Sequence, residues 1–271
     1  MDQFKSKVAV ITGGASGIGR ALAGELGRRG ARLVLADLNA SLLAETVASL
    51  TRSGCEAAGT TLDVTDFEAV KRLVDDTFSA YGSLDFIFNN AGISILGEAL
   101  DFSIDDWRRV IDVNLYGVVH GVAAAYPVMV EQGSGHIVNT SSLAGLFPAV
   151  GEISYTTSKY GVVGLSEVLR MEGAKYGVKV SAVCPGFIHT PIYESIGVVG
   201  FDRGKMAALT PRGMAPEKCA RIVLRGVERN RAIIPVSASA HIAWRAERFA
   251  PRLVRAFDRR MLETFRKTKS R

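Results

Sequence analysis

The sequence has few of the residues that form disulfides or hold metals. It contains three cysteines and four histidines. Cys55, Cys184 and Cys219 are widely spaced with no Cys-x-x-Cys pair, and the histidines form no His-x-x-x-His or His/Cys cluster. These absences exclude a disulfide framework and predict no metal site. The odd number of thiols is typical of reduced, partly buried cysteines in a cytosol-like compartment.

The sequence also lacks long apolar runs, linkers and repeats. No uninterrupted apolar run approaches the roughly 18 residues of a membrane-spanning helix. The first residues, MDQFKSKVAVITGG, lack the apolar core of a secretory signal. No Pro/Ser-rich or low-complexity tract divides the 271 residues. We therefore expect a cytoplasmic protein with one domain over residues 1–240 and a C-terminal extension over 241–271.

Apolar, β-branched runs alternate along the chain with stretches of helical period. The predicted strands are 7–12, 32–37, 57–64, 84–90, 135–142, 179–186 and 231–236, and the predicted helices are 17–29, 40–53, 66–81, 103–131, 153–177 and 215–229. Continuous apolar strands between helices indicate a parallel sheet covered on both faces. The pattern predicts an α/β fold, a single-domain Rossmann-type doubly wound parallel sheet of about seven strands. Ligands of such sheets bind beyond the carboxyl ends of the strands.

A glycine-rich turn joins the first predicted strand to the first helix in VITGGASGIGRALAGEL, with Gly13, Gly17 and Gly19. Such a turn lets backbone N–H groups approach a pyrophosphate at the helix N-terminus. The spacing is GxxxGxG and differs from the common GxGxxG dinucleotide pattern. The alternative is a glycine turn that packs the helix on the sheet without a ligand.

A carboxylate ends the second predicted strand. Asp37 follows Gly19 by 18 residues, in LVLADLN. A carboxylate there can accept hydrogen bonds from both adenosine-ribose hydroxyls and would repel the 2′-phosphate of NADP. Asp37 could instead cap the next helix, although Asn39 could do so equally well. We predict NAD rather than NADP as the cofactor.

The stretch YTTSK places Tyr155 and Lys159 four residues apart on a predicted helix. Side chains at that spacing share one face. A free tyrosine has a pKa near about 10, and a nearby ammonium favours the phenolate, so the pair could act as an acid or base. A solvated helix face without a joint role is the alternative for this pentapeptide alone.

Seven short motifs in one order resemble those of the short-chain dehydrogenase/reductase family, over about residues 5–236. They are TGGASGIG (12–19), LDV (62–64), NNAG (89–92), VNLYG (113–117), NTSSLAG (139–145), YTTSK (155–159) and PGFIHT (185–190). The resemblance implies a dinucleotide-dependent oxidoreductase with a conserved set of site residues.

The resemblance implies the following roles. The catalytic residues would be Asn114, Ser142, Tyr155 and Lys159, and Ser142 and Tyr155 would also bind the substrate. Ser142 is chosen because the family places its serine 13 residues before the tyrosine, so that the neighbouring Ser141 would be turned away. The cofactor-binding residues would be Gly13, Ser16, Gly17, Ile18, Gly19, Asp37, Leu38, Asp63, Val64, Asn90, Ala91, Gly92, Tyr155, Lys159, Pro185, Gly186, Ile188 and Thr190.

The expected activity is NAD(H)-dependent interconversion of a secondary alcohol and a ketone. The segment 187–210 is predicted to be a substrate lid. Apolar residues of this lid and of two preceding loops suggest a lipophilic substrate; they are Ile95, Leu96, Phe147, Val150, Ile188, Ile192, Tyr193, Ile196, Val198, Val199 and Phe201. His189 is interpreted as a bystander. The alternatives are an acyl-thioester (3-oxoacyl) reductase, whose basic tail would recruit an acidic carrier, and a dinucleotide sensor without turnover.

The C-terminal part departs from the family. RAIIPVSASAHIAW stands in place of the Gly-rich final strand that joins the family's tetramers. The resemblance implies a homodimer through the helices at 103–131 and 153–177, or a homotetramer. Residues 1–200 hold 15 Lys/Arg and 21 Asp/Glu, whereas residues 201–271 hold 18 and 6.

The last residues read as a basic amphipathic helix in which apolar side chains recur every four positions. They are Phe249, Leu253, Phe257, Met261 and Phe265. Pro251 predicts a helix start or kink. Residues 245–271 could contact an anionic membrane peripherally, or pack on the protein itself or on a dimer mate. No nucleic-acid partner is expected, because the tail has few aromatics arranged for stacking.

Overall fold

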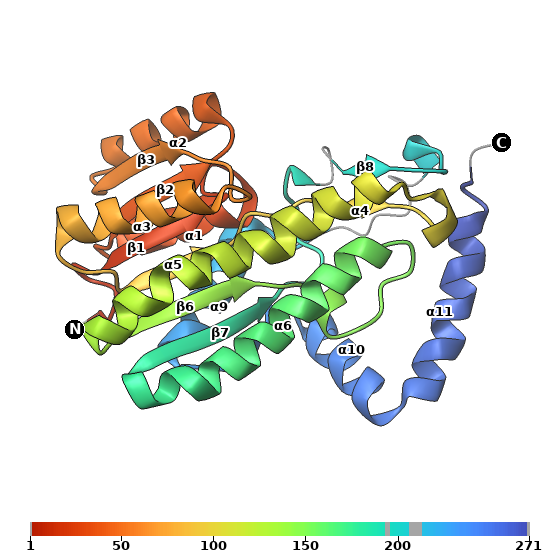
Figure 1. Ribbon diagram of the computed structural model, residues 1–271. Helices are drawn as coiled ribbons and strands as arrows, with labels where there is room; N and C mark the ends of the chain where they lie inside the picture. Colours follow the sequence, from red (N-terminus) through yellow and green to blue (C-terminus); the bar gives the residue numbers. More distant parts are fainter. Residues whose placement is uncertain (1, 193–195, 206–212, 270–271) are drawn as a thin grey trace.

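A seven-stranded parallel sheet forms the centre of the protein. The computed structural model describes residues 2–192, 196–205 and 213–269. The strands lie in the order β3-β2-β1-β4-β6-β7-β9 (Figure 1), and every pairing between neighbours is parallel. Their bounds are β1 Val8–Thr12, β2 Arg32–Asp37, β3 Ala57–Thr61, β4 Phe86–Asn89, β6 Gly135–Thr140, β7 Val178–Cys184 and β9 Ile233–Pro235. This confirms the predicted doubly wound sheet. The strands are added in one direction from β1 to β3 and in the opposite direction from β4 to β9, so the order switches between β1 and β4.

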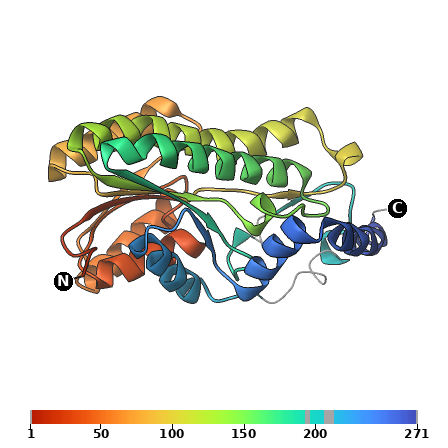
Figure 2. The ribbon, with the colours of Figure 1, turned by 90° about the horizontal axis from the view of Figure 1, so that it is seen from below.

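Helices cover both faces of the sheet. Figure 2 shows α5 and α6 on one side of the sheet and α1 and α9 on the other. The helix bounds are α1 Gly17–Arg28, α2 Ala40–Arg52, α3 Phe67–Tyr81, α4 Ile104–Ile111, α5 Gly117–Gln132, α6 Ile153–Gly173, α9 Pro216–Glu228, α10 Ala238–Phe249 and α11 Pro251–Arg266. Two separate cores result, because each sheet face is apolar and each is covered by a different set of helices.

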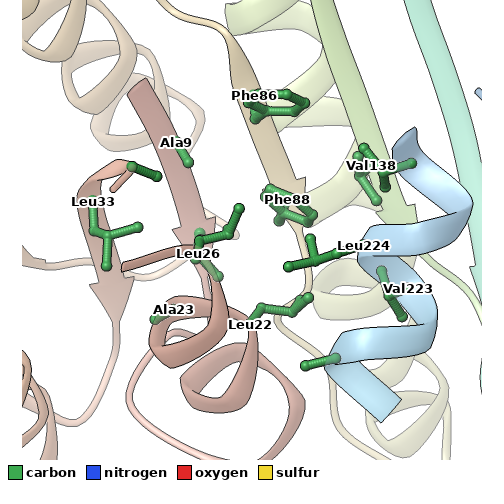
Figure 3. Packing of buried hydrophobic residues seen from close by; sticks show 14 of the residues in the cluster. Ala9, Leu22, Ala23, Leu26, Leu33, Phe86, Phe88, Val138, Val223 and Leu224 are labelled. Atoms are coloured by element: carbon green, nitrogen blue, oxygen red, sulfur yellow. The ribbon is translucent and has the colours of Figure 1, made fainter. Parts of the chain in front are cut away.

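The core between the sheet, α1 and α9 illustrates the packing (Figure 3). Leu22 and Leu26 of α1 lie beside Leu224 of α9, over Phe88 of β4. Leu22 and Leu26 are one turn apart on α1 and so lie on the same face. This core packs α1 against the sheet, and the N-terminus of α1 therefore lies at the carboxyl end of β1.

Several helices and strands end at different residues in the structure than the sequence predicted. Strand 57–64 ends at Thr61, and 135–142 ends at Thr140. The predicted helix 103–131 is divided into α4, a π-helical turn η2 (Asp112–Tyr116) and α5. A two-stranded sheet that was not predicted pairs β5 (Ile95–Leu96) with β8 (Gly197–Val198). The three cysteines are free and buried, which agrees with the expected reduced thiols.

The helical run Ile104–Gln132 is long and apolar enough to cross a membrane by length and composition. The sequence predicted no membrane-spanning helix, because the chain has no uninterrupted apolar run of that length. Core helices pass the same criterion, and α5 contacts α3 and β6 in the layered core. A single run of this kind is therefore weak support for a span.

The C-terminal extension consists of two helices, α10 and α11, that meet at Ala250 and Pro251. In Figure 1 they form a V that leaves the body of the protein and returns to it near the segment before α4. The return is fixed by Asp202 N–H, which donates to Thr268 O at 2.9 Å, and by an antiparallel bridge between Phe201 and Lys269. The predicted break at Pro251 is confirmed.

Two glycines of α1 provide a test of the packing. A Cβ on Gly19 would lie 2.1 Å from the carbonyl oxygen of Gly13, whereas a Cβ on Gly24 would meet nothing within 4 Å. We expect Gly19→Ala to lower the free energy of unfolding by about 1–3 kcal/mol through overpacking. Gly24→Ala should raise it by about 0.5–1 kcal/mol through helix propensity. Urea denaturation measures both, and equal effects of the two substitutions would contradict the packing described.

Candidate active site

A cleft of about 350 Å³ lies at the carboxyl ends of the strands. Every predicted cofactor-binding residue except Gly19 lines it, and so do Ser142, Tyr155 and Lys159. The lining also includes Ile192 of the predicted lid and residues that were not predicted: Ala36, Leu62, Ile93, Val113, Thr140, Ser141 and Pro191. The structure therefore brings most of the predicted set to one place. Another hollow, of about 630 Å³ between α2 and β3, contains Arg52 but none of the predicted residues.

The glycine turn forms one wall of the cleft. Gly13 and Gly17 have φ angles of 63° and 50°, a region that glycine adopts without steric cost. Gly19 does not line the cleft; its missing Cβ lets α1 approach the Gly13 carbonyl. The first turn of α1 contains no acidic residue, so its backbone N–H groups can face an anion without local repulsion.

Asp37 is fixed beside this turn. Its carboxylate accepts hydrogen bonds from Ala15 N–H and Asn39 N–H, both at 3.0 Å. Asn39, rather than Asp37, caps α2, because the Asn39 side chain accepts from Leu42 N–H. The capping alternative for Asp37 is thus wrong, and its carboxylate lies at the cleft with Leu38 exposed next to it.

Hydrogen bonds through Asn90 connect three strand ends. The Asn90 side chain donates to Thr12 O at 3.2 Å, and Thr140 Oγ1 donates to Asn90 Oδ1 at 3.3 Å. Thr12 Oγ1 in turn accepts from the N–H groups of Asn90 and Ala91. The ends of β1, β4 and β6 are therefore held at fixed spacing. The sequence did not indicate that Thr12 and Thr140 connect strand ends, because their hydrogen-bond partners are far away in the sequence.

Lys159 is almost fully buried in the floor of the cleft. Its Nζ donates to Thr140 O at 2.9 Å and lies 5.4 Å from the centre of the Tyr155 ring. Burial lowers the pKa of Lys159 to about 8. The two residues of the YTTSK pair thus lie together at the cleft, on the first turns of α6.

The two serines of NTSSLAG differ in their surroundings. Ser141 is buried, and its hydroxyl donates to Lys159 O at 2.8 Å. Ser142 Oγ accepts from Ala144 N–H at 3.1 Å, an interaction that leaves its proton available. Both residues line the cleft, but the Ser141 hydroxyl already has a partner in the protein.

Asn114 is fully buried beneath the cleft and does not line it. Its amide pairs with the backbone of Ile93 in both directions, at 2.8 and 2.9 Å, and also donates to Ser158 Oγ at 3.2 Å. Asn114 lies within η2, the π-helical turn. Such turns occur frequently at functional sites, and their i→i+5 pairing interrupts the ordinary carbonyl ladder.

An apolar cluster forms in the region of the predicted lid and the loops before it. The Phe201 and Phe265 rings pack at an angle of 45° with their centres 4.3 Å apart, and Leu96, Val150 and Val198 pack against them. Phe265, from α11, was not predicted to belong to this region. Tyr193 and the parts 193–195 and 206–210 of the predicted lid lie outside the described residues. Within the described ranges, no group of three or more His, Cys, Asp or Glu could hold a metal ion.

Comparison with known proteins agrees with this arrangement. The sequence profile of the short chain dehydrogenase family matches residues 7–197. The chain belongs to the short-chain dehydrogenase/reductase family. It is 39% identical over 246 residues, 89% of each chain, to a protein of Mycobacterium tuberculosis named as an oxidoreductase, SadH. Cyclohexanol dehydrogenase of Acinetobacter sp. is 37% identical over 227 residues, which cover 82% of this chain and 88% of that protein.

Among solved structures, a short-chain dehydrogenase/reductase of Burkholderia phymatum in complex with NAD has a TM-score of 0.85 and 33% identity. The match covers 93% of this chain and 96% of that one. The fold of this short-chain dehydrogenase/reductase is therefore that of its family.

Glu152 is a titratable group of this dehydrogenase that the sequence did not single out. It precedes α6, and its backbone pairs with Gly97 at an isolated bridge next to β5. Burial raises the pKa of Glu152 to about 7, and no cation offsets this effect. The folded protein thus holds the proton up to about pH 7, while the unfolded chain releases it near about pH 4.3.

Glu152→Gln should therefore stabilise the protein only at higher pH. Between the pKa of Glu152 in the unfolded chain and its higher pKa in the folded protein, only the unfolded chain releases the proton. The free energy of unfolding therefore falls as pH rises through this range. We expect no gain below about pH 4, and a gain of about 1–2 kcal/mol above pH 7, limited because the residue is half-buried. Urea denaturation at several pH values measures it. Glu45→Gln, at an exposed carboxylate on α2, is the control, and a pH-independent gain in Glu152→Gln would refute the assignment.

Proposed function

We propose that this protein is an NAD(H)-dependent oxidoreductase that interconverts a secondary alcohol and a ketone. The observation that carries the proposal is that Tyr155, Ser142 and Lys159 line the same cleft as the glycine turn and Asp37. A dinucleotide cradle and an acid/base group then share one cavity. A protein that only sensed the dinucleotide would not need the acid/base group.

The cleft fits a dinucleotide cofactor on its own chemistry. The glycine turn offers N–H groups to the pyrophosphate, and Asp37 offers oxygens to the adenosine ribose. Asp63 and Val64 would contact the adenine, while Ile188 and Thr190 would lie at the nicotinamide. When bound, NAD⁺ supplies the hydride acceptor for the carbinol carbon.

The side chains around the substrate oxygen would then handle the proton. Tyr155 would accept the hydroxyl proton during oxidation and return it during reduction. Ser142 would donate a hydrogen bond that positions the substrate oxygen. The Lys159 ammonium would favour the phenolate of Tyr155, since an opposite charge at short range stabilises the anion. Asn114 would act through its main chain, with its side chain fixing the turn.

An apolar alcohol or ketone fits the substrate side best. Leu96, Val150 and Val198, with the Phe201 and Phe265 rings, form an apolar cluster in the region of the predicted lid. The relative named as cyclohexanol dehydrogenase points to the same kind of substrate.

We further infer a homodimer through α5 and α6. Large apolar side chains on the outer face of α6 remain exposed in the single chain, including Tyr160, Val168 and Met171. A contiguous exposed patch of this kind marks an interface.

Turnover of secondary alcohols tests the proposal directly. We expect NAD⁺ reduction with kcat/KM rising with the chain length or ring size of the alcohol. Tyr155→Phe should lower kcat by about 10²–10⁴-fold, because the acid/base group is lost, while the Kd for NADH stays within about twofold. Stopped-flow absorbance and NADH fluorescence measure the two quantities. Tyr160→Phe, one helical turn further along α6, is the control; turnover retained in Tyr155→Phe would exclude the proposed role.

Cofactor choice tests Asp37 separately. Asp37→Ser should reduce the preference for NAD⁺ over NADP⁺ in kcat/KM by about 10–100-fold, since it removes charged hydrogen bonds of about 1.5–3 kcal/mol and the repulsion of a 2′-phosphate. Asn39→Ser replaces the capping amide oxygen of α2 with a capping hydroxyl and should leave the preference unchanged. The role of Asp37 fails if both variants shift the preference equally.

A further inference from the structure

An apolar stripe runs along the outer side of the C-terminal helices. Phe249, Leu253, Phe257 and Met261 are 81%, 74%, 59% and 48% exposed. The last three recur every four residues along α11 and so lie on one side of it. Large exposed apolar side chains aligned over three turns are a feature of binding surfaces.

The stripe is not required to hold α11 in place. Val254 and Phe265 are buried, and on the helix they lie at the edge of the stripe next to Met261. The end of α11 is also attached to the body by Arg266, which pairs with Glu98 at 2.6 Å, and by Lys269, which pairs with Glu98 at 3.2 Å. Leu253, Phe257 and Met261 remain exposed although the helix is attached at these places.

Positive charge accompanies the stripe. Arg252, Arg255, Arg259 and Arg260 are exposed on α11. Among the ion pairs of the described residues none involves these four guanidinium groups. The acidic residues of the same two helices number three: Glu247, Asp258 and Glu263.

We propose that the outer face of α10 and α11 binds the surface of an anionic lipid bilayer. The apolar stripe would enter the boundary between headgroups and acyl chains, and the arginines would contact lipid phosphates. A second copy of this chain fits less well, because pairing two such faces would bring arginines against arginines. A bilayer matches both the apolar stripe and the charge.

The last residue of the same helical row gives a further reason for such docking. Phe265 follows Met261 by one turn of α11 and packs in the apolar cluster with Phe201, in the region of the predicted substrate lid. Figure 1 shows α11 extending away from that region. On the proposed function, a lipophilic substrate could therefore reach the lid region from the bilayer along α11. The docking itself does not depend on that function.

Vesicle co-sedimentation of the full-length protein tests the proposal. We expect binding to phosphatidylcholine vesicles that contain phosphatidylserine, a loss of binding as NaCl is raised, and none to phosphatidylcholine alone. The variant Phe257→Ser/Met261→Ser should weaken binding more than about tenfold, and so should Arg252→Gln/Arg259→Gln/Arg260→Gln.

Matched variants provide the controls. Leu100→Ser removes an apolar side chain that is 93% exposed outside the extension. Arg72→Gln/Lys218→Gln/Arg221→Gln removes the same three charges from exposed positions elsewhere. Both should bind like the wild type, and circular dichroism checks that every variant is folded.

Two outcomes would overturn the proposal. One is no binding to anionic vesicles, or an equal loss in the control variants. The other is a stripe variant that dissociates an oligomer in light scattering while vesicle binding stays absent, which would make a second copy the occupant. Tyr155→Phe should bind vesicles like the wild type, so failure of docking and failure of the proposed catalysis are measured separately.

Discussion

The hydrogen bonds of the Asn90 side chain are the constraint on which the cleft depends. They join the ends of β1 and β6 to the segment after β4, and the Thr140 carbonyl at the same junction accepts from Lys159. The backbone ladders of the parallel strands end before the loops begin. A side-chain tie beyond the last ladder bond keeps the glycine turn, the serine segment and α6 at fixed separations. Tyr155, Lys159 and the glycine turn therefore share one rigid frame.

The substrate side is built on a different principle. It extends from the main sheet through β5 and β8, each of two residues, and such a small sheet cannot be stable alone. The C-terminal segment supplies what is missing. Phe265 fills the space above Gly151, where a Cβ would lie 2.4 Å from its ring, and Glu98 pairs with two cations of the tail. Exposed ion pairs contribute little individually, so the aromatic contact provides most of the attachment.

Periodicity in the sequence was enough to predict the sheet and its helices, because buried parallel strands are continuous apolar runs. The resemblance to the family supplied most of the predicted cofactor residues, and they meet in one cleft because the carboxyl ends of parallel strands meet at one edge. Local pattern could not decide between Asp37 and Asn39 as the cap of α2; the hydrogen bond from Leu42 decides it. The π-helical turn at Asn114 and the contact of Arg266 with Glu98, 168 residues apart, depend on tertiary packing and leave no local signal.

The burial of Lys159 gives the Tyr155–Lys159 pair its electrostatic strength. A solvent-exposed ammonium would be screened by water and counter-ions, and would act weakly on a phenolate. Burial strengthens the interaction but also penalises the charge, which lowers the pKa of Lys159 to about 8. The Thr140 carbonyl offsets part of that penalty by accepting one ammonium proton, and it leaves the remaining donors for the cleft. Lys159 is thus still cationic at neutral pH, and because it is buried, water screens its charge only weakly.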